Sequence, residues 1–162
     1  NTPPASNNIV KEFDWRTRHG SQNIDSYYYN SDGSGWIPRW RYGQVCAECW
    51  TFTVQYAVEA MVNLYFNRQL NDELSVQDIL SCSGAGTWCS GGHVYAALDY
   101  VAISGIVNNS CFPYHSCQTI QCTEKCPNPN ELVSIAGRSN RINGEDNIKE
   151  ELITKGVLST DL

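Results

Sequence analysis

The feature that most constrains this sequence is a pair of cysteines directly in front of a long apolar run. Cys46 and Cys49 stand three positions apart, and no glycine or proline interrupts the residues from Cys49 to about Arg68. Apolar side chains recur at helical spacing through this run, which predicts a buried helix that begins at the second cysteine. Glu59 lies inside the run and must therefore be paired, hydrogen-bonded or placed at an edge.

Further helices and a strand are predicted along the rest of the chain. Ser75 followed by Asp78 forms a box-like signal for the start of a short helix. Gly105 and Gly156 each follow a helical pattern and are expected to end it. The three helices are expected over residues 73–80, 93–105 and 144–156, and the strand within residues 132–142.

Composition limits the class of protein. The chain has 162 residues, of which 41% are hydrophobic, so it can bury a core of its own. No apolar stretch approaches about eighteen residues, and we expect no membrane-spanning helix. The net charge of −6 and the absence of a basic cluster argue against nucleic acid or an anionic membrane as a partner. Eight cysteines fit an oxidising compartment or a metal protein.

A metal site and a redox dithiol are two uses of paired cysteines that the rest of the chain does not favour. A structural zinc site needs two ligand pairs on short turns, and Cys122 with Cys126 would be the second pair. However, Cys49 opens a bulky apolar helix instead of a knuckle turn. A thioredoxin-like dithiol needs a βαβ pattern before the motif, whereas residues 19–43 are rich in aromatic and loop-forming residues. We therefore expect no metal and no other cofactor.

Two interpretations of Cys49 remain. As a nucleophile it would lie in the first turn of the helix, where free backbone N–H groups and the helix dipole favour a thiolate. Cys46 would then bridge a distant cysteine, and Gln44 would donate its amide N–H to an oxyanion together with the Cys49 N–H. Alternatively, both cysteines are disulfide partners. Counting slightly favours that alternative, because eight cysteines can all pair.

Five segments in order over residues 13–114 resemble the papain family of cysteine proteases. "FDWR" is similar to the family's D-W-R entry segment, and "CAECWTF" is similar to C-G-S-C-W-A-F, whose second cysteine is the nucleophile. "ELSVQDILSCSG" resembles L-S-E-Q-x-L-x-D-C. "CSGGHVYAALDYVAISGI" resembles C-x-G-G-x-x-x-x-A-x-x-Y-x-x-x-x-G-I, and "CFPY" resembles the (C)-x-P-Y that follows it. "CTEKC" and "CFPY" are similar to cathepsin B-like members in particular.

The resemblance implies a fold and a division of the chain. It implies an α+β, papain-like fold of two lobes, in which the helical lobe has a long central helix. Residues 1–127, including the N-terminal segment, would form the complete helical lobe. Residues 128–162 would form the start of the β-rich lobe, most of which this chain would not contain.

The resemblance also assigns roles to single residues. Cys49 would be the nucleophile and Gln44 an oxyanion-hole donor, while Trp50 and Phe52 would pack in the central helix. Glycines suit the substrate edge because no side chain blocks the approach of another backbone. The residues implied along an extended substrate are Gly91 and Gly92, with His93 and Val94 at the pocket for its second side chain. The implied disulfides are Cys46–Cys89, then Cys82–Cys122 or Cys82–Cys117, and Cys111–Cys126.

Three departures from the family pattern bear on activity. Gln44 stands two residues before Cys46, where the family usually has three. Glu48 places a carboxylate next to the nucleophile, and if it points inward it should weaken the thiolate. A papain-like mechanism also needs a His to take the thiol proton and an Asn to orient it. The chain's His19, His93 and His115 do not fall at the family's catalytic position.

The sequence therefore predicts a papain-like cysteine peptidase, or the nucleophile-bearing part of one, that cleaves polypeptides through a thioester on Cys49. The missing His and Asn would come from a second chain or from a C-terminal part of a longer protein. A secreted, lysosomal or other oxidising location is expected, with a zymogen as the precursor. The alternative is an inactive papain-like module that serves as a structural or binding subunit of a larger assembly through its aromatic loop at residues 27–42.

Overall fold

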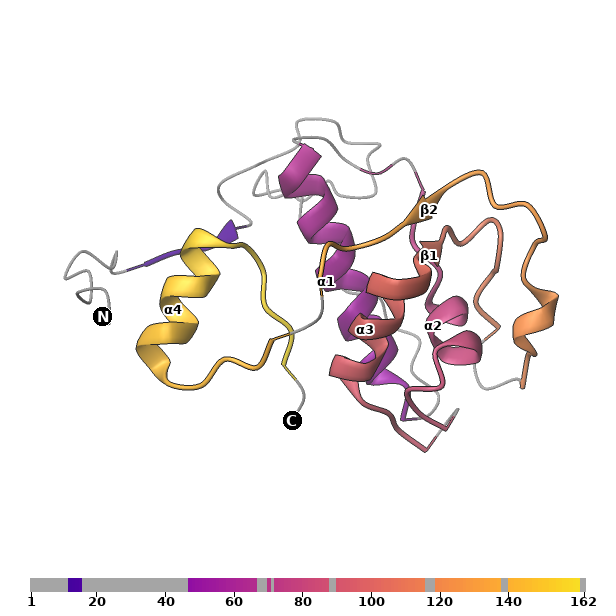
Figure 1. Ribbon diagram of the computed structural model, residues 1–162, viewed down its shortest axis with the longest axis horizontal. Coiled ribbons are helices and arrows are strands. Elements are labelled where there is room, and N and C mark those ends of the chain that lie inside the picture. The colour runs from indigo at the N-terminus through magenta and orange to yellow at the C-terminus, as the bar shows by residue number, and fades with distance from the viewer. Residues whose placement is uncertain are drawn as a thin grey trace.

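The computed structural model describes residues 12–15, 47–66, 70, 72–87, 90–115, 119–137 and 140–160. Its body is built from α1 (Cys49–Phe66), α2 (Val76–Cys82) and α3 (Val94–Ser104), which pack side by side (Figure 1). The long helix predicted after the second cysteine is confirmed over Cys49–Phe66, and residues 67–68 of its expected range lie outside the described residues. None of the described helices is long and apolar enough to cross a membrane.

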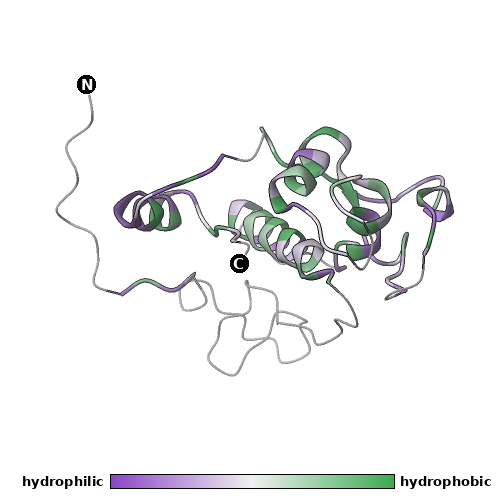
Figure 2. Cartoon of the chain, turned by 90° about the horizontal axis from the view of Figure 1, so that it is seen from below, coloured by the Kyte–Doolittle hydropathy of each residue, from purple (hydrophilic) through white to green (hydrophobic). Residues whose placement is uncertain are grey.

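The core lies between these three helices. Figure 2 shows hydrophobic residues gathered on the helices of this body. The central side chains come from all three helices and from the strand after α3: Trp50, Val54, Val58, Ile79, Leu80, Val94, Ala97, Val101 and Ile106. Glu59 is also fully buried there, and its Oε1 accepts hydrogen bonds from Gln55 Nε2 at 2.5 Å and Leu74 N at 2.7 Å. The expectation that Glu59 is hydrogen-bonded is confirmed.

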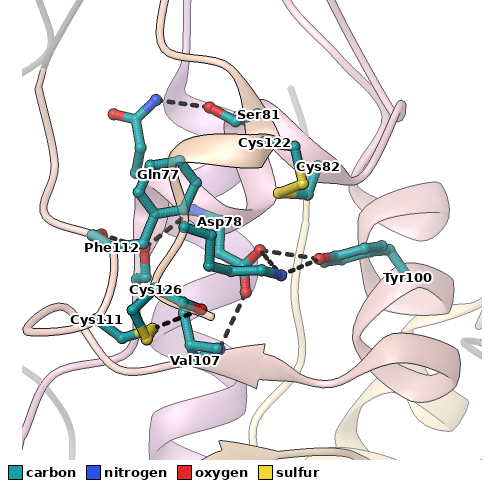
Figure 3. Close-up of polar contacts among 12 residues, drawn as sticks. Gln77, Asp78, Ser81, Cys82, Tyr100, Val107, Cys111, Phe112, Cys122 and Cys126 are labelled. Atoms are coloured by element: carbon teal, nitrogen blue, oxygen red, sulfur yellow. Dashed lines mark hydrogen bonds and ion pairs between the residues drawn. A yellow bond between two sulfur atoms is a disulfide. The ribbon is translucent and has the colours of Figure 1, made fainter. Parts of the chain in front are cut away.

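The start of α2 differs from the predicted capping box. Ser75 Oγ accepts the Asp78 N–H at 2.9 Å, as an N-cap should. The Asp78 carboxylate does not return to the Ser75 backbone, because Ser75 N–H donates to Val107 O at 2.8 Å. Instead it accepts hydrogen bonds from Val107 N at 3.0 Å, Tyr100 Oη at 2.8 Å and Lys125 Nζ at 3.0 Å (Figure 3). Asp78 thus joins α2 to β1, α3 and the later loop.

Two disulfides close the loop that follows β1. Cys82–Cys122 ties the end of α2 to a single 3-10 turn at Cys122–Glu124, and Cys111–Cys126 closes a shorter loop (Figure 3). Both pairings are confirmed, the first against the alternative with Cys117. The implied Cys46–Cys89 bridge lies outside the described residues, as does Cys117.

A small sheet continues the helical body. Gly105 ends α3 with a φ of 74°, as predicted, and β1 (Ile106–Val107) follows directly. It pairs antiparallel with β2 (Leu132–Val133) in the register Ile106↔Val133 and Val107↔Leu132. Because Val133 packs against the core, the chain still belongs to this body beyond residue 127. The expected boundary between residues 127 and 128 stays a prediction.

The last helix, α4 (Glu145–Thr154), lies apart from the three-helix body (Figure 1) and has no buried residue. Trp15 Nε1 donates a hydrogen bond to Leu152 O at 2.8 Å, so Trp15 of the "FDWR" motif contacts this helix. After α4 the chain returns to α1 at Gly156, which has a φ of 126°. Residues with a side chain rarely adopt this φ, and a Cβ at Gly156 would also displace the Met61 side chain, so glycine is favoured here.

The Asp78 contacts predict a dependence of stability on alkaline pH. Burial, followed by the neighbouring Asp78 carboxylate, raises the pKa of Tyr100 well above its usual range. The half-buried Tyr100 hydroxyl therefore stabilises the fold fully below about pH 10, and this contribution is lost as the pH rises above that value. We expect Tyr100→Phe to lower the free energy of unfolding by about 1–3 kcal/mol near neutral pH.

Urea unfolding of the two proteins at neutral pH and above about pH 10 measures this difference. The difference between wild type and Tyr100→Phe should shrink at the higher pH. A difference that stays constant would mean that the Tyr100–Asp78 contact does not stabilise the fold in this way.

Candidate active site

Cys49 is exposed, unbridged and the first residue of α1. The helix starts tightly, because both the backbone N–H and the hydroxyl of Thr51 donate to Glu48 O, at 3.0 Å and 2.7 Å. The first backbone N–H groups of a helix have no partner within it and attract negative charge. The Cys49 thiol therefore lies at the end of the helix that carries these N–H groups.

The segment with Gly91 and Gly92 lies directly beside this helix start. Ala47, two residues before Cys49, forms a parallel bridge with Ser90. Trp50 is buried, and a Cβ at Gly92 would be 2.6 Å from its Cδ2 atom, which is closer than side chains tolerate. Only a glycine can thus lie against the Trp50 indole, which positions this segment next to the thiol.

Gly92 also presents a free backbone edge. It forms an antiparallel bridge with Gly86, and the flanking hydrogen bonds are Thr87 N to Gly91 O at 3.0 Å and His93 N to Ala85 O at 2.9 Å. In such a pair the N–H and C=O of the bridged residue point away from its partner. Within the described residues no backbone group bonds to them. An extended peptide can pair with an edge of this kind.

A family model identifies the chain. The model described as "Papain family cysteine protease" matches residues 9–162. The chain belongs to the papain family of cysteine proteases. The resemblance predicted from its motifs is confirmed.

Among curated proteins of this family, the chain is similar to cathepsin B-like cysteine proteinase 3 of Caenorhabditis elegans, with 34% identity over 51% of this chain and 24% of the relative. It is similar to the viral cathepsin of Cydia pomonella granulosis virus, with 24% identity over 93% of this chain and 39% of the relative. The chain therefore spans well under half the length of these two relatives.

Solved structures of papain-family proteins confirm the fold. A Carica candamarcensis cysteine protease matches with a TM-score of 0.60 and 31% identity, over 74% of this chain and 55% of that chain. Procathepsin L 3 of the Tenebrio molitor larval midgut matches in fold with a TM-score of 0.61 and 22% identity, over 88% of this chain and 49% of that chain. The described helices and two-stranded sheet are consistent with the helical lobe and part of the β-rich lobe.

The other predicted site residues differ in how far they are exposed to solvent. His93 is exposed and precedes α3, with its ring 5.7 Å from that of Tyr95. Val94 is buried in the core, so its side chain points into the body and not toward the free edge of Gly92. Substrate contacts by these residues stay predictions, and Gln44 lies outside the described residues. No cluster of His, Cys, Asp or Glu suited to a metal occurs within the described part of the chain.

Two residues that contact the candidate site, Tyr114 and Gly86, are not predicted from the sequence. Tyr114 donates a hydrogen bond from its hydroxyl to Glu48 Oε1, which is fully buried. Tyr114 belongs to the "CFPY" motif, but nothing in that motif indicates a long-range partner. Gly86 pairs with Gly92, and its signal is the run of small residues around it, "SGAG".

The contact between Gly92 and Trp50 predicts the effect of a single methyl group. We expect Gly92→Ala to lower the free energy of unfolding by about 1–3 kcal/mol, because the added Cβ overlaps the buried indole. Ser90→Ala, on the same segment at an exposed position, should change it by less than about 0.5 kcal/mol. Equal effects of the two substitutions in urea unfolding would contradict the close packing.

Proposed function

We propose that this chain carries the nucleophile of a papain-type cysteine peptidase that hydrolyses peptide bonds. The observation that carries the proposal is an exposed, unbridged thiol at the start of α1 beside the free backbone edge of Gly92. These are the two parts that such chemistry needs from one chain, a reactive thiol and a place to align a peptide.

The reaction begins when the Cys49 thiolate attacks the carbonyl carbon of a peptide bond. Its sulfur forms a C–S bond, and the carbonyl oxygen becomes an oxyanion held by the Cys49 N–H and, as the sequence predicts, the Gln44 amide. Collapse of this intermediate breaks the C–N bond, and the leaving amine takes the proton that the thiol gave up. Water then hydrolyses the thioester, which releases the acid and restores the thiol.

A base must take and return that proton. The backbone N–H of His115 donates to Gln77 Oε1 at 3.0 Å, and neither His115 nor His93 falls at the family's catalytic position. We therefore assign the base and its orienting Asn to a part of the protein outside this chain, either a second chain or a longer C-terminal region.

The substrate is a polypeptide in extended conformation. The N–H and C=O of Gly92 would each exchange a hydrogen bond with one substrate residue, which fixes its distance from Cys49. His93 lies one residue further and borders the next side chain.

Two matched structures are a ragweed pollen protease in its proform and a procathepsin B of Trypanosoma congolense, which supports a precursor for this protein too.

Two disulfides support an oxidising location, which for this family means secretion or the lysosome.

The alternative function is an inactive papain-like module within a larger assembly. It is favoured by the buried Glu48 carboxylate directly before the nucleophile, where the family motif has a small neutral residue.

The experiment compares the mature full-length protein with its Cys49→Ser variant on a fluorogenic peptide. We expect the substitution to lower kcat by a factor of about 10³ or more, because the hydroxyl is a far weaker nucleophile at this site. The thermal unfolding midpoint should not change, since the thiol is exposed.

Two outcomes would overturn the proposal. One is a mature protein that hydrolyses no peptide, which would favour the inactive module. The other is hydrolysis that persists in Cys49→Ser, which would place the chemistry elsewhere.

A further inference from the structure

Three exposed side chains from two distant segments meet directly after Gly92. The ring of His93 lies 5.7 Å from the ring of Tyr95, measured between their centroids. The guanidinium carbon of Arg141 lies over the same Tyr95 ring, 4.9 Å from its centroid. Arg141 belongs to the segment between β2 and α4, which passes beside the start of α3 (Figure 1). Two rings and a permanent positive charge therefore follow the candidate peptide edge.

Tyr95 gives the guanidinium a fixed support. It is the second residue of α3, and the preceding Val94 is buried in the core, so the backbone at this point is held by the body. The face of an aromatic ring attracts a cation, and an arginine above it can still donate from the N–H groups that do not face the ring. The Tyr95 ring therefore restricts where Arg141 lies and leaves part of its donors available.

The charge of Arg141 has no carboxylate partner among the residues that the structure describes. Arg141 lines a hollow of about 300 Å³ between residues 140–143 and α4. Glu150 and Glu151 line the same hollow, but neither forms an ion pair with the guanidinium. A carboxylate that arrives from outside therefore does not have to displace one that is already bound.

The peptide edge leads toward this charge. A peptide that pairs with Gly92 places its neighbouring residue beside His93, which follows directly in the chain. Side chains of an extended peptide alternate between its two faces, so one of the residues next to the paired position turns its side chain toward the rings. A long acidic side chain that crosses His93 and Tyr95 meets Arg141, whose planar donors match a carboxylate.

We propose that Arg141, supported by Tyr95, selects peptides that carry an acidic side chain close to the residue paired with Gly92. Arg141 contacts the substrate but not the reacting atoms, so it determines specificity and leaves the chemistry to Cys49. The inference rests on the proposed function and deepens it, because it names the class of polypeptide that this site accepts.

The test measures peptide binding to the mature full-length protein with Cys49→Ser, so that no peptide is consumed. The probes are fluorescein-labelled peptides with blocked ends that differ only in Glu or Gln at one position, and each position is tried in turn. Fluorescence anisotropy gives the two Kd values. Their ratio, Kd for Gln divided by Kd for Glu, reports the preference for the acid.

We expect a ratio of about twofold to fivefold at one position at low ionic strength, and a smaller ratio in high salt. Arg141→Gln should lower the ratio to about one. Tyr95→Leu, which removes the ring beneath the guanidinium, should lower it as well. Lys155→Gln also removes one exposed positive charge and should keep the wild-type ratio, which makes it the matched control.

A ratio of about one at every position would overturn the inference, as would a preference that persists in Arg141→Gln or falls equally in Lys155→Gln. A protein that binds none of the peptides would overturn it too. Circular dichroism melting identifies a variant that has unfolded, and the other of the two variants, Arg141→Gln or Tyr95→Leu, then decides.

Binding does not require hydrolysis, so the two proposals fail separately. A preference that depends on Arg141 supports the inference even where the mature protein with Cys49 intact hydrolyses no peptide. Hydrolysis that depends on Cys49, without any preference that depends on Arg141, would remove the inference alone.

Discussion

The contact between the Trp50 indole and the backbone of Gly92 places the two halves of the candidate site beside each other. Trp50 follows Cys49 in the first turn of α1 and is buried, so it anchors the end of the helix that carries the thiol. Gly92 lies against this ring and turns its own N–H and C=O outward through its bridge with Gly86. A side chain at position 92 would separate the thiol from the peptide edge.

Buried polar groups make the surroundings of this contact rigid. Glu59 joins α1 to Leu74, two residues before α2, and Asp78 joins α2 to β1, α3 and Lys125. Each carboxylate accepts hydrogen bonds from more than one group, including backbone N–H groups far away in the chain, so it holds several segments together. The two disulfides hold the later loops on the same frame. The thiol is therefore exposed on a body that does not need to move to present it.

Much of the fold can be predicted because its signals are local. The start of α1 after the cysteine pair, Ser75 as the N-cap of α2 and Gly105 at the end of α3 all follow from neighbouring residues. The motifs of the family add a bridge from Cys82 to either Cys122 or Cys117, and the structure shows the bridge to Cys122. What the sequence does not reveal is where buried carboxylates find their partners. Asp78 has the spacing of a capping box but binds Tyr100 and Lys125 instead, because the Ser75 N–H already donates to Val107 O.

The same limit applies to the site. The motifs point to Cys49 as the candidate nucleophile and to the glycine edge, whereas the contact of Glu48 with Tyr114 joins positions separated by 66 residues. Val94 is adjacent to the edge in sequence but faces the core, since it belongs to the buried side of α3. The direction of a side chain at a helix start depends on how the helix packs, and this is a property of the whole body.

The central claim is that the sulfur of Cys49 is unbridged while the neighbouring frame is closed by disulfides. The most direct test is to block free thiols in the native, unreduced full-length protein and to map all cysteine peptides by mass spectrometry. The account predicts the blocking group on Cys49 and intact links between Cys82 and Cys122 and between Cys111 and Cys126. A peptide in which Cys49 is disulfide-linked to another cysteine would contradict it.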